Sequence, residues 1–208
     1  FSNLRQSAQQ SGSLFSRTFD NMFKFLRFYA AGGLLVGSIR SVRGAIDEIK
    51  VLDKQMVELS RVTSASTSEL EAFYKQAPTV ASSLGVLTSE VISVTAEISK
   101  LGYSLQDAQY LTELSLIGKT VGDLNSAGDA VDYITSTIKG FRLETKDSAS
   151  VLDYMNHTAN TTSINFAAIG EGFKRMSASM AEGNNSIQES MGMLVAGYDI
   201  TRDAETTA

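Results

Sequence analysis

Apolar residues recur at steps of three and four through residues 140–197, which is the spacing of a helix that buries one face. One stretch carries four such residues: Val151, Leu152, Met155 and Ala159. The next stretch repeats the pattern with Phe166, Ile169, Phe173, Met176 and Met180. Short polar breaks separate these stretches, so the region is predicted to form three helices folded on one another.

Each of these helices begins near a residue whose side chain can cap it. The candidates are Thr145 or Ser148 for the first helix, Ser163 or Asn165 for the second, and Ser186 for the third. Such oxygens accept hydrogen bonds from the unpaired N–H groups of a first helical turn. Ser186 with Glu189 three residues later has the spacing of a reciprocal capping box.

The region before residue 140 shows the same alternation of apolar stripes and polar breaks. Ser68 with Glu71 has the spacing of another capping box. Pro78 is expected to bend or interrupt the helix that follows, because proline lacks a backbone donor and clashes inside a helix. Gly85 can end that helix in the left-handed conformation, and Thr88 is expected to start the next one.

Two further helices are predicted before residue 140. Gly102 is expected to close the first, and Ser104 with Asp107 to start the second. The second has an apolar side made of Leu105, Ala108, Leu111, Leu114 and Ile117. Residues 123–128 form another polar break. A glycine, then Ser or Thr, then an acidic residue recurs at several breaks; because the residues between do not match, we interpret this as helix stops and restarts rather than a sequence repeat.

The N-terminal part is predicted to be a helical arm. An apolar stripe with steps of three and four runs from Ile39 to Leu59. We favour an extended arm or self-association through this helix, with a core helix of the same domain as the alternative. The uncharged run at residues 28–39 is shorter than the about 20 residues that a spanning helix needs, so a transmembrane helix is disfavoured. Gly33 and Gly37 have a spacing that allows close helix approach.

Together these patterns predict an all-α fold. A long N-terminal helical arm over residues 1–62 is followed by a compact bundle of short capped helices over residues 63–208. No segment alternates with period two, so strands are not expected. A single proline in 208 residues agrees with a helical chain. The chain starts without Met and stops inside a helix-like pattern, so we interpret it as a fragment of a longer protein.

The net charge of −5 is unevenly distributed. Residues 1–43 hold six Lys or Arg against one acidic residue, whereas the rest of the chain holds 12 basic and 22 acidic residues. We favour solvated helix faces as the explanation; a basic arm that meets an acidic partner or a membrane surface is the alternative. An acidic main body argues against a specific nucleic-acid site, because phosphate contacts need clustered Lys and Arg.

Residues suited to catalysis are sparse. His157 is the only histidine and cysteine is absent, so a metal site lacks ligands. Asp153 lies one helical turn before His157, where an ordinary hydrogen bond is the expected role. The glycines at residues 118–122 lack the spacing of a phosphate-binding loop. We therefore predict that the chain is not an enzyme, with no catalytic, cofactor-binding or metal-binding residue and no cofactor.

The order of these segments resembles the helical core region of the phage tail tape measure proteins. The matching segments are LDKQMVELSRVTSASTSELEAF, ASSLGVLTSEVISVTAEISKLGYSLQDAQYLTELSLIG, YITSTIKGFRL, VLDYMNHTAN and EGFKRMSASMAEGNNSIQESMGML. The resemblance covers residues 40–208 and rests on the ordered series rather than on a single motif. Residues 1–39 fit it in character only.

The resemblance implies a structural phage or prophage tail protein that sets tail-tube length and assists DNA ejection. Such proteins lie in the lumen of the tail tube in several copies, after assembly in the host bacterial cytoplasm. The implied partners are the tail tube protein, tail assembly chaperones and further copies of the chain, which would associate through the N-terminal helix. Some members carry a peptidoglycan hydrolase domain, but no segment here matches one.

Residues 19–39 support an alternative function. They form the most apolar part of the chain and carry basic residues. A membrane-active, pore-forming helical protein would use such a segment to contact the host membrane. Binding to anionic vesicles distinguishes this function from a purely structural one.

Overall fold

The structure is a computed structural model that describes the backbone of residues 39–208 and the side chains of residues 50–208. Every regular element in this part of the chain is helical, which confirms the predicted all-α class there. Most of the predicted N-terminal arm lies outside the described residues, including Gly33, Gly37 and nearly all of the apolar run. The arm therefore stays a prediction.

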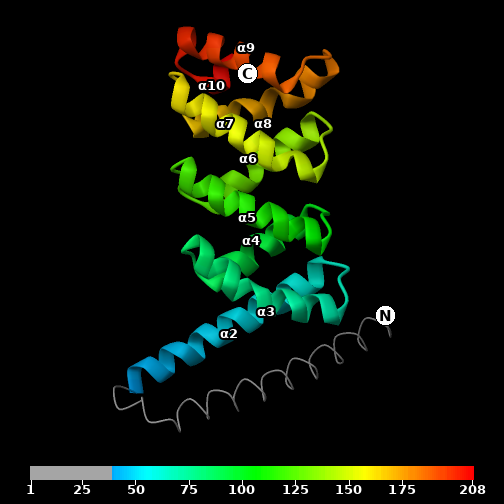
Figure 1. The fold of residues 1–208 in the computed structure, drawn as a ribbon, viewed down its shortest axis with the longest axis vertical. Coiled ribbons are helices and arrows are strands. Elements are labelled where there is room, and N and C mark those ends of the chain that lie inside the picture. The colour runs from blue at the N-terminus through cyan, green and yellow to red at the C-terminus, as the bar shows by residue number, and fades with distance from the viewer. Residues whose placement is uncertain (1–38) are drawn as a thin grey trace. The chain divides into compact units, whose positions relative to one another are not determined.

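The helices follow one another through short connections (Figure 1). They are α2 Ile39–Val62, α3 Thr67–Leu84, α4 Thr88–Lys100, α5 Leu105–Val121, α6 Ala127–Gly140, α7 Ser148–Thr161, α8 Phe166–Glu182, α9 Ile187–Thr201 and α10 Ala204–Thr207, with a 3-10 turn, η1 Thr145–Asp147, before α7. The chain divides within α2 into two units, Phe1–Asp53 and Lys54–Ala208. The second unit contains α3 to α10. The predicted domain boundary after residue 62 stays a prediction.

Within Lys54–Ala208 the helices form consecutive pairs. These are α3 with α4, α5 with α6, α7 with α8, and α9 with α10. The second helices of the pairs begin at Thr88, Ala127, Phe166 and Ala204, at steps of 39, 39 and 38 residues. The recurring stops and restarts in the sequence therefore mark a structural repeat of about 39 residues, although the residues between them do not match.

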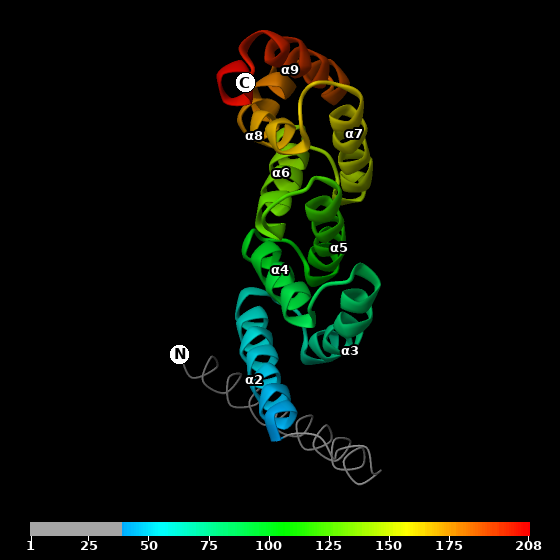
Figure 2. The same ribbon diagram turned by 90° about the vertical axis from the view of Figure 1, so that its left-hand side faces the viewer.

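Contacts between successive pairs arrange the helices in two layers. In one layer α4 contacts α6, α6 contacts α8, and α8 contacts α10; in the other α3 contacts α5, and α5 contacts α7. Figure 2 shows α4, α6 and α8 on one side of this unit and α3, α5 and α7 on the other. Helical solenoids have this organisation, in which each repeat packs mainly on its neighbours. The predicted bundle is thus a two-layer stack of helix pairs.

The turn from one pair to the next has the same backbone plan three times. A residue in the left-handed conformation follows the second helix of a pair: Gly102 at φ 93°, Arg142 at φ 56° and Asn184 at φ 60°. Two residues later comes an N-cap, with an acidic residue three positions beyond it: Ser104 with Asp107, Glu144 with Asp147, and Ser186 with Glu189. Local capping chemistry therefore sets these short connections.

The first capping box lies two residues before its predicted position. The Ser66 hydroxyl accepts a hydrogen bond from the Glu69 N–H at 3.3 Å, and the Glu69 carboxylate accepts one from the Ser66 N–H at 2.7 Å. Ser68 with Glu71 has the same spacing, but a start at Ser66 gives α3 two more residues and their backbone hydrogen bonds. The prediction of Ser68 and Glu71 was wrong for this reason.

The predicted caps of α8 and α9 are present. Ser186 and Glu189 form the reciprocal box at the start of α9, as expected. Asn165 caps α8, because its Oδ1 accepts a hydrogen bond from the Ala168 N–H at 2.8 Å. The alternative cap, Ser163, instead donates a hydrogen bond to Asp199 of α9.

The predicted cap of α7 was wrong. Neither Thr145 nor Ser148 accepts a capping hydrogen bond, because the 3-10 turn η1 leads directly into α7. Two hydrogen bonds between Glu144 and Asp147 close that turn: the Glu144 N–H donates to Asp147 Oδ2 at 3.0 Å, and the Asp147 N–H donates to the Glu144 carbonyl at 2.9 Å. Ser148 is fully buried as the first residue of α7.

Pro78 does not interrupt α3, which runs unbroken from Thr67 to Leu84. The cost of proline inside a helix is about 3 kcal/mol. Burial of the apolar face of α3 offsets this cost, through Leu70, Phe73, Ala77 and Ala81. Gly85 ends the helix in the left-handed conformation at φ 69°, as predicted.

The predicted apolar stripes form most of the core. In α8, Phe166, Ile169, Phe173 and Met176 are buried and Met180 is half-buried. The stripe of α5 was partly wrong, because Ile117 is 37% exposed whereas Leu116 is only 1% exposed. This helix contacts α4, α6 and α7, so it buries more than one side, including Thr112 and Ser115.

Candidate functional site

The titratable pair that the sequence offered for chemistry lies on the surface of α7. His157 and Asp153 are both exposed on α7, and the described structure has no hydrogen bond between their side chains. Within residues 50–208, no group of three or more His, Asp or Glu side chains is placed to hold a metal ion. The absence of catalysis and of a cofactor stays a prediction.

Gly118 and Gly122 serve helix packing. A Cβ on Gly118, inside α5, would lie 3.2 Å from Leu152 Cδ1, and one on Gly122 would lie 2.5 Å from Phe166 Cδ1. A phosphate loop presents free backbone N–H groups, whereas the Gly122 N–H donates to the Gly118 carbonyl at 2.9 Å. These glycines therefore allow α5 to approach α7 and α8.

A partly buried polar cluster joins α6 to α8. The Tyr133 hydroxyl donates a hydrogen bond to Glu171 Oε1 at 3.1 Å, and Lys174 Nζ lies 3.7 Å from Asp132 Oδ2 and 5.9 Å from the centre of the Tyr133 ring. Burial, followed by the hydrogen bond to Glu171, raises the pKa of Tyr133 well above its usual value of 10.0. The phenol therefore keeps its proton over a wider pH range and stays a donor in the hydrogen bond that links α6 to α8.

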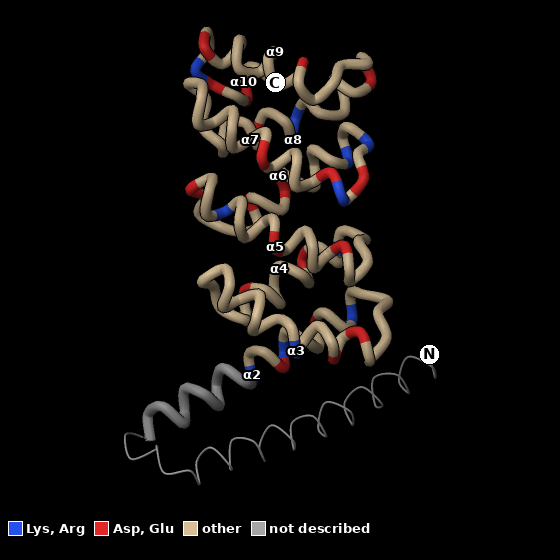
Figure 3. The backbone as a smooth tube through the Cα atoms, in the orientation of Figure 1, with Lys and Arg blue, Asp and Glu red and all other residues tan. Residues whose placement is uncertain are grey.

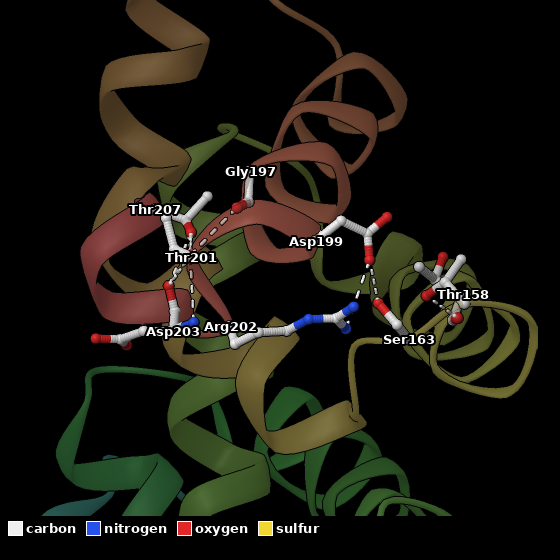
Figure 4. Close-up of polar contacts among 9 residues, drawn as sticks. Thr158, Ser163, Gly197, Asp199, Thr201, Arg202, Asp203 and Thr207 are labelled. Atoms are coloured by element: carbon white, nitrogen blue, oxygen red, sulfur yellow. Dashed lines mark hydrogen bonds and ion pairs between the residues drawn. The ribbon is translucent and has the colours of Figure 1, made fainter.

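A second polar cluster closes the end of α9 (Figure 4). Asp199 accepts a hydrogen bond from Ser163 and lies 3.7 Å from Arg202, so it ties α9 to the connection between α7 and α8. The Thr201 and Thr207 hydroxyls share a hydrogen bond of 2.7 Å, which links α9 to α10. These polar side chains are exposed and pair with one another, as expected for contacts that stabilise the last helix pair.

Charges of both signs are spread along the stack (Figure 3). Ion pairs between side chains of the described residues link different helices, among them Glu58–Lys100, Glu90–Lys119, Asp132–Lys174 and Arg175–Glu205. Residues 54–208 contain 11 Lys or Arg and 19 Asp or Glu. Nucleic-acid surfaces gather Lys and Arg on one face, so this distribution argues against such an interface on the described residues.

A shallow groove lies between α3, α4 and α5. It is lined by Phe73, Gln76, Ala77, Val80, Val91, Thr95, Gln109, Thr112 and Glu113. Its enclosed space is about 10 Å³, far below the roughly 300–1,000 Å³ of typical ligand pockets. The groove has neither the size nor the convergent charges of a cofactor site.

Among the described helices, none is by itself long and apolar enough to cross a membrane. The pair Thr67–Leu84 and Thr88–Lys100, bent by 112°, meets the length and composition criteria when its two helices are taken together. The predicted membrane segment at residues 19–39 lies almost wholly outside the described residues.

The described side chains thus build and hold a helical stack. A protein-family profile for phage-related minor tail proteins matches residues 74–208, about two thirds of the chain. The chain belongs to this family. No solved structure gives a significant match.

Membership in the minor tail protein family supports a structural role in a phage tail and implies a virion-associated protein. The match includes α4 to α10 and most of α3, so the two-layer stack is the part of the chain that carries the family likeness. The resemblance to phage tail proteins seen in the sequence is confirmed at this level.

Proposed function

We propose that this chain is part of a tape measure protein, which sets the length of the tail tube and assists DNA ejection. The observation that carries the proposal is the family match over residues 74–208, which coincides with a stack of helix pairs. A stack grows by a constant increment for each added pair, and a straight helix grows by about 1.5 Å per residue. In either form the length of the chain is converted into a physical length.

The same proposal specifies location and partners. The protein lies in the lumen of the tail tube after assembly in the host cytoplasm, and contacts the tail tube protein and assembly chaperones. Copies associate through the N-terminal helix. Residues 19–39 contact the host membrane during ejection, and leakage from anionic liposomes tests that step: a chain without residues 19–39 should lose the leakage that the full chain causes.

Deletion of one helix pair tests the ruler. Removal of residues 104–143 joins Tyr103 to Glu144 and keeps the turn plan, because Glu144 takes the position of Ser104. The tail should shorten by about 60 Å if these 40 residues act as one straight helix. It should shorten by only about 10 Å if they act as one layer of the stack, given interhelix distances of about 8–10 Å.

Electron microscopy of purified tails measures this change. His157→Ala, an exposed substitution that leaves chain length unaltered, is the matched control and should give tails of normal length. Assembled tails of unchanged length from the deletion variant would contradict a ruler role for this region.

A further inference from the structure

Buried hydroxyl groups line the contact between α4 and α5. Thr95 and Ser99 lie four residues apart on α4, and Thr112 and Ser115 lie three apart on α5, so each pair shares one helix face. All four side chains are at most 3% exposed. Thr95 Oγ1 and Thr112 Oγ1 lie 2.9 Å apart and mark where the two faces meet. We name these four residues the hydroxyl seam.

Hydrogen bonds within the hydroxyl seam are incomplete. The Thr95 hydroxyl also lies 2.8 Å from the Val91 carbonyl, and that of Thr112 lies 2.7 Å from the Ala108 carbonyl. The Thr95 and Thr112 hydroxyls carry two protons but make three short oxygen–oxygen contacts, so one contact has no proton between its oxygens. The Ser99 and Ser115 hydroxyls are buried with no protein partner. Buried polar groups that lack partners favour any state in which water reaches them.

Further along the stack, glycines allow α6 and α8 to pack very closely against each other. A Cβ on Gly140 of α6 would lie 2.0 Å from Ser177 Oγ of α8, and one on Gly170 of α8 would lie 2.2 Å from the Tyr133 ring of α6. Such close approach maximises dispersion contacts between helices. Helices α3 and α4 contain no glycine, so no glycine of theirs allows such close helix packing.

The shallow groove described above borders half of the hydroxyl seam, since Thr95 and Thr112 form part of its lining. Beside the seam, one ion pair bridges the two helices: Lys119 Nζ lies 2.7 Å from Glu90 Oε1, with both side chains about 30% exposed. The connection between α4 and α5 contains Gly102 in the left-handed conformation at φ 93°. The groove thus borders the seam, and the two helices are joined by a short turn that contains glycine.

We propose that the stack opens first at the hydroxyl seam, where the helix pair α3–α4 separates from α5–α10 about Gly102 while the later pairs stay packed. Separation lets water reach the four hydroxyls and leaves the close packing of α6 on α8 intact. The helix pairs of the stack then separate one after another and do not unfold together in one cooperative step. This inference does not depend on the proposed tape measure function.

A disulfide across the seam tests the proposal. The chain has no native cysteine, and the 2.9 Å distance between the Thr95 and Thr112 hydroxyl oxygens puts cysteines at these positions within bonding reach. Hydrogen exchange of the whole 208-residue chain with Thr95→Cys and Thr112→Cys is measured oxidised and reduced. In the reduced form, buried α4 amides should exchange at least about tenfold faster than those of α6 and α8. Oxidation should slow α4 exchange at least tenfold and leave α6 and α8 unchanged.

Two substitutions act in opposite directions without a cross-link. Thr112→Val removes a hydroxyl and should slow α4 exchange, whereas Lys119→Met removes the bridging ion pair and should accelerate it. Lys146→Met, at an exposed ion pair with Glu144, is the control and should leave α4 exchange unchanged. Equal protection of α4, α6 and α8 in the native chain would overturn the proposal, as would an α4 exchange rate that is the same oxidised and reduced.

Discussion

Substitution of Gly170 by alanine tests the close packing of α6 on α8. A Cβ at this position would lie 2.2 Å from two atoms of the Tyr133 ring, whereas ordinary contacts begin at 3.4 Å. The ring must therefore move by about 1.2 Å, the difference between these distances. Tyr133 is only 6% exposed and its hydroxyl is bonded to Glu171, so the movement disturbs both packing and a hydrogen bond.

Overpacking of this kind costs about 1–3 kcal/mol. Replacing glycine by alanine inside a helix returns about 1 kcal/mol through helix propensity. We expect Gly170→Ala to lower the free energy of unfolding by up to about 2 kcal/mol. For a domain of 150–250 residues this lowers the melting temperature by up to about 8 °C.

Gly192→Ala is the matched control. Gly192 is an exposed glycine inside α9, and a Cβ there meets nothing within 4 Å. The same substitution should therefore stabilise by about 0.5–1 kcal/mol and raise the melting temperature. Thermal unfolding followed by circular dichroism measures both variants, and exchange of α6 and α8 amides localises the effect. The reasoning fails if Gly170→Ala stabilises the protein as much as Gly192→Ala does.

Further predictions concern a cap and the buried phenol. Ser186→Ala should destabilise α9 by about 1 kcal/mol, measured as faster amide exchange in α9, and equal loss in a distant helix such as α4 would contradict a local cap. The Ser186 backbone and side-chain hydrogen bonds lower the pKa of Glu189, so this carboxylate stabilises the fold above its usual pKa of 4.5 and the contribution is lost as pH falls through the lowered value. Acid titration of α9 stability should therefore be shallower in Ser186→Ala than in the native chain. Tyr133 has a raised pKa, so its contribution is complete below pH 10.0 and is lost as pH rises further. Tyr133→Phe should remove part of the stability loss above pH 10. Identical alkaline unfolding curves for the native chain and Tyr133→Phe would contradict this assignment.

The helices were largely predictable because their signals are local. Ser104, Asn165 and Ser186 act within three residues of their partners, and Gly85 adopts the left-handed conformation that a helix end requires. Errors arose where two local signals compete. Ser66 and Ser68 each have an acidic residue three positions later, and the sequence cannot rank these two starts without the length of helix that each one allows.

The structural supports were harder to predict because their partners are distant. Ser163 meets Asp199 across 36 residues, and Tyr133 meets Glu171 across 38. The repeat of about 39 residues was visible in principle as evenly spaced caps. Because Glu144 replaces Ser at one of them, and Leu87 stands where a polar cap would be expected, the spacing alone did not reveal it.

By itself, the sequence determined that residues 39–208 are helical, where most of their helices begin and end, and that the chain resembles phage tail proteins. These properties depend on interactions within one or two helical turns, or on the order of segments. The tertiary structure decided that the helices stack as pairs in two layers, that Pro78 stays inside α3, and that Thr95 and Thr112 are buried against each other. The physical reason is that the apolar periodicity of one helix identifies a single buried face. A second face of the same helix becomes buried only when a neighbouring helix pair packs on it, and the sequence of one helix does not show that contact.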